Sequence, residues 1–219
     1  MRQHWQFIAM VAAVFLLWNT PLMIPLKILT VFFHELSHAL AALLTGGSVE
    51  SISISPRQGG LTTTRGGSLF WITSAGYIGS LLFGVALFVL ALKSRADKLV
   101  MAALGGLLLL VAALYMRTVF ALGFTVASGV AMIITAKYLP QQASDATLRV
   151  IGLTSMIYVP FDILSDTILR AGLRSDAYNM AQQFGGATAM WGGLWLLLSV
   201  AVIWITLKKG LKGQSRIRF

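Results

Sequence analysis

The residues with the clearest potential for chemistry are His34, Glu35 and His38, which lie in the segment His34-Glu35-Leu36-Ser37-His38. On an α-helix, two histidines four residues apart lie on one face, so both imidazoles can bind one zinc ion. Glu35 lies beside them and can take a proton from water that the metal activates. The alternative is that these polar side chains hydrogen-bond to neighbouring helices and only hold the helices together.

A catalytic zinc site needs a third protein ligand, and the sequence offers few. The chain has 3 histidines and no cysteine, so we expect a carboxylate. Inside the apolar segments, the only acids besides Glu35 are Asp162 and Asp166. At 1.5 Å per residue, the two histidines lie roughly 10–17 Å from Lys27, whereas Asp162 lies about 20 Å and Asp166 about 25 Å from Arg149. Depth in the membrane therefore favours Asp162 as the third ligand, with Asp166 as the alternative.

The other acids, and one histidine, lie in loops or at the ends of apolar segments, where we expect solvated side chains. They are His4, Glu50, Asp97, Asp145 and Asp176. For Asp166, the alternative to metal ligation is a place near the membrane interface, paired with Arg170 four residues later.

These residues are embedded in a very apolar chain. Of its 219 residues, 57% are hydrophobic and 11% charged, with a mean hydropathy of +0.81. This is too little charge to cover a water-soluble domain, so we expect a single integral membrane domain over residues 1–219. The fold class is an all-α polytopic bundle of about seven transmembrane helices, with six as the alternative. The expected spans are Trp5–Met23, Leu26–Leu44, Leu69–Leu92, Leu99–Tyr115, Val119–Tyr138, Leu148–Leu169 and Ala187–Leu207.

The net charge of +10 does not indicate nucleic-acid binding. The basic residues lie between apolar stretches and in the tail 208–219, where they orient spans and contact anionic lipid headgroups. With seven spans, eleven Lys and Arg residues fall on one side and six on the other. The positive-inside rule then places the C-terminus in the cytoplasm and the N-terminus outside, most simply in the cell membrane. An even number of spans breaks this assignment.

The longest loop, Thr45–Ser68, carries a strict alternation over Ser51–Ser55, which is the period of a β-strand. A short hairpin at the membrane surface is plausible. It would offer an edge to an unwound substrate, although a simple flexible loop is an equal alternative. Gly76 and Gly79 are expected to let helices pack closely, or else to place backbone near a substrate.

The segment from His34 to Gly47 resembles the zinc helix of the intramembrane metalloproteases of the site-2 protease clan, and more closely the compact peptidase M50B-like branch. The supporting segments are Ser74–Ser80, Phe161–Asp166 and Ser175–Ala177. The resemblance implies a zinc ion held by His34, His38 and a later Asp, with Glu35 as general base in a water-accessible cavity. The better-known members place a glycine after that Asp, whereas here Ile163 follows Asp162.

The residues and the resemblance together predict a zinc metalloprotease that hydrolyses a peptide bond in or near a transmembrane segment of a membrane protein. The first alternative is an inactive zinc-binding membrane chaperone or regulator, which would not need Glu35. The second is a metal or ion transporter. Against transport, the intramembrane polar residues cluster at one depth, and no inverted repeat is evident.

Overall fold

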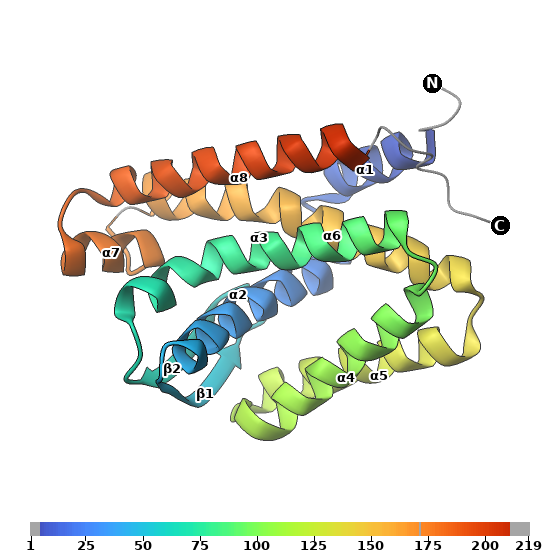
Figure 1. Ribbon diagram of the computed structural model, residues 1–219, viewed down its shortest axis with the longest axis horizontal. Helices are drawn as coiled ribbons and strands as arrows, with labels where there is room; N and C mark the ends of the chain where they lie inside the picture. The colour runs from blue at the N-terminus through green and yellow to red at the C-terminus, as the bar shows by residue number, and fades with distance from the viewer. Residues whose placement is uncertain (1–4, 171, 211–219) are drawn as a thin grey trace.

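The computed structural model describes residues 5–170 and 172–210. It is a bundle of α-helices with one two-stranded hairpin at one end (Figure 1). In chain order, the elements are α1 Trp5–Leu17, the 3-10 turn η1 Pro21–Met23, α2 Ile24–Leu44, β1 Ser48–Ile54, β2 Gly60–Arg65, α3 Leu69–Lys93, α4 Asp97–Tyr115, α5 Val119–Tyr138, α6 Gln141–Leu164, the π-helical turn η2 Ser165–Leu169, α7 Asp176–Phe184 and α8 Thr188–Gly210.

Six helical stretches in the described chain are long and apolar enough to cross a membrane. They are Pro21–Leu44, Leu69–Lys93, Asp97–Tyr115, Val119–Tyr138, Gln141–Leu169 and Thr188–Lys209. The expected all-α membrane bundle is therefore confirmed, with six long helices instead of seven. The division into two expected spans, Leu99–Tyr115 and Val119–Tyr138, is also confirmed, because α4 and α5 are separate helices.

The expected first span, Trp5–Met23, is wrong as a full crossing. Helix α1 ends at Leu17 and has 13 residues, which gives a length of about 20 Å, against about 30 Å of hydrocarbon. The chain turns at Thr20, and Pro21 then starts the short turn η1. Helix α2 begins directly after that turn.

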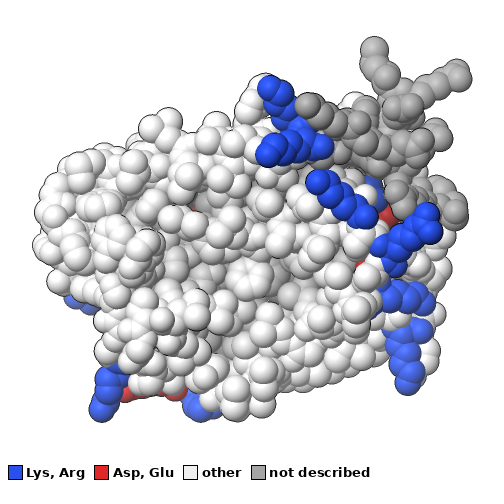
Figure 2. Space-filling model, in the orientation of Figure 1, with Lys and Arg blue, Asp and Glu red and all other residues white. Residues whose placement is uncertain are grey.

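The orientation that assumed seven spans does not hold for this arrangement. Helix α1 begins and helix α8 ends at the same end of the bundle (Figure 1). Lys and Arg side chains gather at that end (Figure 2). Helix α3 ends, α4 begins, and α5 and α8 end at this side of the bundle (Figure 1), and these helix ends carry Lys93, Lys98, Lys137, Lys208 and Lys209. The positive-inside rule still predicts that the basic end, where α8 ends, faces the cytoplasm.

The predicted hairpin is confirmed at the opposite end. Strands β1 and β2 are antiparallel, with Ile52 opposite Thr62 and Ile54 opposite Gly60. Ile52 and Ile54 are buried, whereas Ser51 and Ser53, which alternate with them, are more exposed. The Ser-Ile alternation therefore places one apolar face of the hairpin against the bundle. Ile52 also forms an isolated bridge with Met116 in the turn between α4 and α5.

Close helix contacts in the bundle depend on facing glycines. A methyl group on Gly152 of α6 would meet the backbone oxygen of Gly84 in α3, and one on Gly129 of α5 would meet that of Gly105 in α4. Small residues are the usual means of bringing membrane helices together, because lipid offers no hydrophobic drive for their association.

Two acids expected to be solvated are buried instead. Asp97 and Asp145 are 4% and 5% exposed. Asp145 forms an ion pair with Arg149, with Arg149 Nε 2.5 Å from its Oδ1, and Asp97 Oδ2 accepts a hydrogen bond from Gln141 at 3.1 Å. The helix ends in this bundle are packed against one another, so position in the sequence alone overestimates their contact with water. His4 lies outside the described residues.

Candidate metal centre

Helix α2 places the two motif histidines side by side. The ring centroids of His34 and His38 are 4.8 Å apart, as their spacing predicts. His38 Nδ1 lies 2.6 Å from the backbone oxygen of Ile72 in α3. A carbonyl only accepts, so Nδ1 is the donor and carries the proton. This leaves His38 Nε2 with a free lone pair in the neutral ring, which is the state a metal ligand requires.

The third residue at this point is Asp176, at the start of α7. Its Oδ2 atom lies 2.9 Å from His34 Nε2 and 3.2 Å from His38 Nε2. Within the described chain, this oxygen is buried and accepts no hydrogen bond of normal geometry. Three atoms that can each offer a lone pair to a cation thus converge on one point. The interpretation of Asp176 as a solvated interface residue is wrong.

Short-range features of the chain hold Asp176 in this place. Ser175 caps α7 and accepts a hydrogen bond from the Tyr178 N–H at 3.2 Å. Asp176 then occupies the first helical turn, where the helix dipole favours a negative charge. Burial alone would raise the pKa of the Asp176 carboxyl, but the His38 and His34 imidazoles outweigh it and hold the pKa well below its ordinary value. The carboxylate is therefore kept ionised, as metal binding needs.

The two glycines of α3 have different roles. A methyl group on Gly79 would collide with the Ser37 side chain of α2, so Gly79 permits close helix packing. A methyl group on Gly76 would collide with both His34 Nε2 and Asp176 Oδ2. Gly76 therefore keeps open the space where the three candidate ligand atoms converge.

Asp162 and Asp166 lie in a different polar cluster. Arg170 Nη2 is 2.6 Å from Asp166 Oδ1 and 3.8 Å from Asp162 Oδ1, and the Tyr77 hydroxyl donates to Asp166 Oδ2. Among the described residues, neither acid forms an ion pair with a histidine. The alternative weighed for Asp166, a pair with Arg170, is what the structure has. The assignment of Asp162 as metal ligand gains no support from the contacts.

Glu35 is buried, at 5% exposure, and its carboxylate faces the hairpin. One candidate ligand atom from each of His34, Glu35 and His38 lies within 4.8 Å of the others. The Thr62 hydroxyl of β2 lies 2.7 Å from Glu35 Oε2. Glu35 is therefore close enough to the histidines to act on a molecule bound there, and it is held by a strand on its other side.

The donor set fits a zinc ion. Two imidazole nitrogens and one carboxylate oxygen are a known three-ligand set of catalytic zinc sites, which leave a fourth position open. The absence of a side chain at Gly76, beside His34 and Asp176, and the buried Asp176 oxygen are two features of this chain that agree with it.

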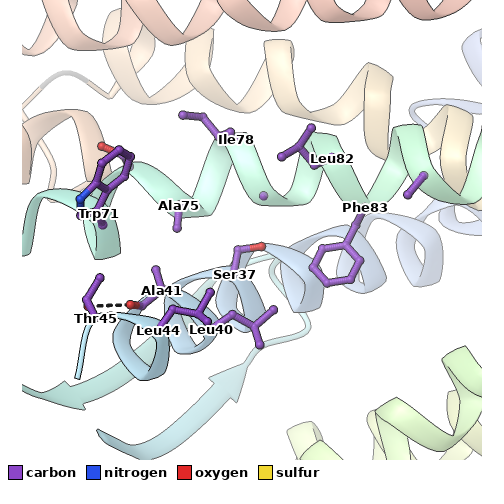
Figure 3. A pocket seen from close by; sticks show the side chains of 13 residues that line it. Ser37, Leu40, Ala41, Leu44, Thr45, Trp71, Ala75, Ile78, Leu82 and Phe83 are labelled. Carbon is purple, nitrogen blue, oxygen red and sulfur yellow. Dashed lines mark hydrogen bonds between the residues drawn. The ribbon is translucent and has the colours of Figure 1, made fainter. Parts of the chain in front are cut away.

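An apolar groove of about 590 Å³ runs between α2 and α3 beside this centre (Figure 3). Its walls include Leu40, Leu44, Trp71, Ile78 and Leu82. None of the residues that line it is titratable, so the chemistry lies next to the groove and not in it.

Sequence reasoning missed Asp176, Gly76 as a site residue, and Thr62. The segment Ser175–Ala177 was among those that carried the family resemblance, and it was the one available signal for Asp176. Asp176 lies outside the apolar spans, whereas only acids inside those spans were candidates for the third ligand. A short helix outside the spans supplies the carboxylate instead.

Comparison with known proteins gives one match. The family model described as Peptidase M50B-like matches residues 7–206. No curated protein and no solved structure matches the chain. The matched region contains His34, Glu35, His38 and Asp176.

Proposed function

Because the chain belongs to the Peptidase M50B-like family, we propose that it is an intramembrane zinc metalloprotease that cleaves membrane protein substrates in or near a transmembrane segment. The observation that carries this proposal is the convergence of Asp176 Oδ2 on the Nε2 atoms of His34 and His38, at 2.9 and 3.2 Å. A membrane protein rarely places three polar groups together among apolar helices without a function for them.

The residues have separate roles in this proposal. His34, His38 and Asp176 hold the zinc ion, and Asp176 replaces Asp162 as the proposed third ligand. Zinc supplies Lewis acidity, which polarises a carbonyl oxygen and makes water more acidic. Glu35 takes a proton from the attacking water and then gives it to the leaving amine. One carboxylate thereby serves as base and as acid in a single turnover.

The hairpin supports a substrate with an extended backbone. A peptide bond inside a helix is shielded, so the substrate has to unwind before hydrolysis. Within the described chain, β2 pairs only with β1, whereas β1 is bridged on its other side by Met116. The outer edge of β2 is therefore the edge to which an extended segment can add by backbone hydrogen bonds.

The first test compares wild type with Glu35→Gln. Membranes from cells that produce each protein are compared by mass spectrometry of new protein N-termini, and zinc is measured per purified chain. We expect about one zinc ion per chain in both proteins. New termini within or beside transmembrane segments are expected with wild type only, since loss of a general base costs about 10²- to 10⁴-fold in rate.

Three results would contradict the proposal. A zinc-free wild-type protein prepared with sufficient metal would exclude the metalloprotease. Equal cleavage by Glu35→Gln would exclude Glu35 as the base. Zinc binding with no cleavage event in wild type would favour the non-catalytic chaperone or regulator.

A further inference from the structure

Glu35 is held by the hairpin in a way that the proposed reaction does not by itself require. The Thr62 hydroxyl oxygen lies 2.7 Å from Glu35 Oε2 and 2.9 Å from the Glu35 backbone oxygen. On the same strand, Gly60 lies against the Glu35 carboxylate, where a methyl group would collide with it. Thr62 thus forms a hydrogen bond with the Glu35 carboxylate, and Gly60 leaves room for that carboxylate.

The register of the hairpin sets both contacts. Thr62 lies opposite Ile52, and Gly60 lies opposite Ile54. Side chains alternate along a strand, so Gly60 and Thr62 share the face on which Ile52 and Ile54 are buried. The buried isoleucines fix this face against the bundle and thereby fix the position of the Thr62 hydroxyl relative to Glu35.

The Thr62 hydroxyl has a single hydrogen to donate, and its oxygen lies within hydrogen-bond distance of Glu35 Oε2. Hydrogen bonds to a charged carboxylate are roughly twice as strong as those between neutral groups. This contact therefore fixes one carboxylate oxygen of Glu35 relative to β2.

We propose that Thr62 is a positioning residue that holds the Glu35 side chain in one orientation beside the candidate metal centre. This inference rests on the proposed function, in which Glu35 is the general base. The hairpin would then have two roles in one turnover, because the strand that offers an edge to the substrate also orients the base.

The test uses three single substitutions in the full-length protein. Thr62→Val keeps the side-chain shape but removes the hydroxyl, and Thr62→Ser keeps the hydroxyl. Thr63→Val is the matched control, because Thr63 lies opposite Ser51 on the exposed face of the same strand. The readouts are zinc per chain, the rotamer of Glu35 in crystal structures, and kcat and KM on a substrate identified by the N-terminus comparison.

We expect all three variants to keep about one zinc ion per chain. In Thr62→Val, the Glu35 carboxylate leaves its place beside β2 and kcat falls about 10- to 100-fold with little change in KM, since small misplacements of a catalytic group cost up to about 10² in rate. Thr62→Ser restores the Glu35 position and most of kcat, and Thr63→Val changes neither.

Unchanged Glu35 geometry in Thr62→Val would overturn the inference, whether or not turnover is measured. Unchanged kcat in Thr62→Val, beside an inactive Glu35→Gln, would overturn it and leave the proposed function standing. Loss of zinc in Thr62→Val would also overturn it, because Thr62 would then support the metal centre as a whole.

Discussion

Two acidic clusters lie near the hairpin end of the bundle, and they differ in what neutralises them. In one, Asp166 and Asp162 face Arg170, and Asp166 accepts a hydrogen bond from Tyr77. In the other, Asp176 faces the Nε2 atoms of His34 and His38. The first cluster contains its own permanent cation, and the second contains only groups that can ligate one.

This difference explains why the intramembrane position of an acid is a poor guide to its role. Placing a carboxylate in an apolar membrane helix costs free energy, so an acid at such a position is usually interpreted as functional. Arg170 removes much of that cost for Asp162 and Asp166. For Asp176, the comparable charge has to come from a bound ion or from protonated histidines. In this chain the neighbouring guanidinium of Arg170, and not depth, distinguishes the salt-bridged acids from the proposed ligand Asp176.

The largest expected effect comes from exchanging the carboxylates for amides. Asp176→Asn should lose zinc, from about one ion per chain to less than a tenth, since an amide is a much weaker zinc ligand. Asp162→Asn is the matched control and should keep its zinc. Metal analysis of both purified variants checks this. The opposite pattern would return the third-ligand role to Asp162.

A smaller effect is expected when the space between the ligands is filled. Gly76→Ala places a methyl group against both His34 Nε2 and Asp176 Oδ2, and zinc affinity should fall by at least about tenfold, a loss of the size that disturbed ligand orientation produces. The control is Gly106→Ala, because a methyl group there meets no atom within 4 Å. Competition with a chromophoric chelator measures both affinities. Equal zinc affinities in Gly76→Ala and Gly106→Ala would show that a methyl group at position 76 does not disturb the proposed ligands.

The smallest effect is expected in the cluster that neutralises itself. Arg170→Gln leaves Asp162 and Asp166 without their cation, and the unfolding free energy should fall by about 1 kcal/mol because the Arg170 side chain is half exposed. Thermal unfolding in detergent measures the loss, and Asp166→Asn added to Arg170→Gln should recover part of it. Zinc content should not change. Loss of zinc in Arg170→Gln would mean that the two clusters act as one site.

The sequence predicts local features of this protein well. Apolar runs predict α3, α4, α5 and α8 closely, and the Ser51–Ser55 alternation predicts β1. The spacing of His34 and His38 predicts their shared face. Each of these follows from periodicity over a few residues, which holds whatever the rest of the chain does.

Features that depend on long-range packing are not predictable in this way. The end of α1 at Leu17 reflects the turn before Pro21, inside a run that is apolar enough to continue. Asp176 reaches the histidines because the chain folds back after η2 and packs α7 against α3 and α8 (Figure 1). Nothing local to Ser175–Ala177 specifies that return. Likewise, Thr62 meets Glu35 only because the hairpin register is fixed by the buried Ile52 and Ile54.

The separation of the proposed ligands along the chain has a topological consequence. His34 and Asp176 are 142 positions apart (176 − 34), in a chain that has no cysteine and so no disulfide. An ion held by both residues is a cross-link that closes a loop of this length, and such a closure removes about 5 kcal/mol of chain entropy from the unfolded state. The metal centre would then be a cross-link between α2 and α7, and α7 would be the element that detaches from the bundle when the ion is removed.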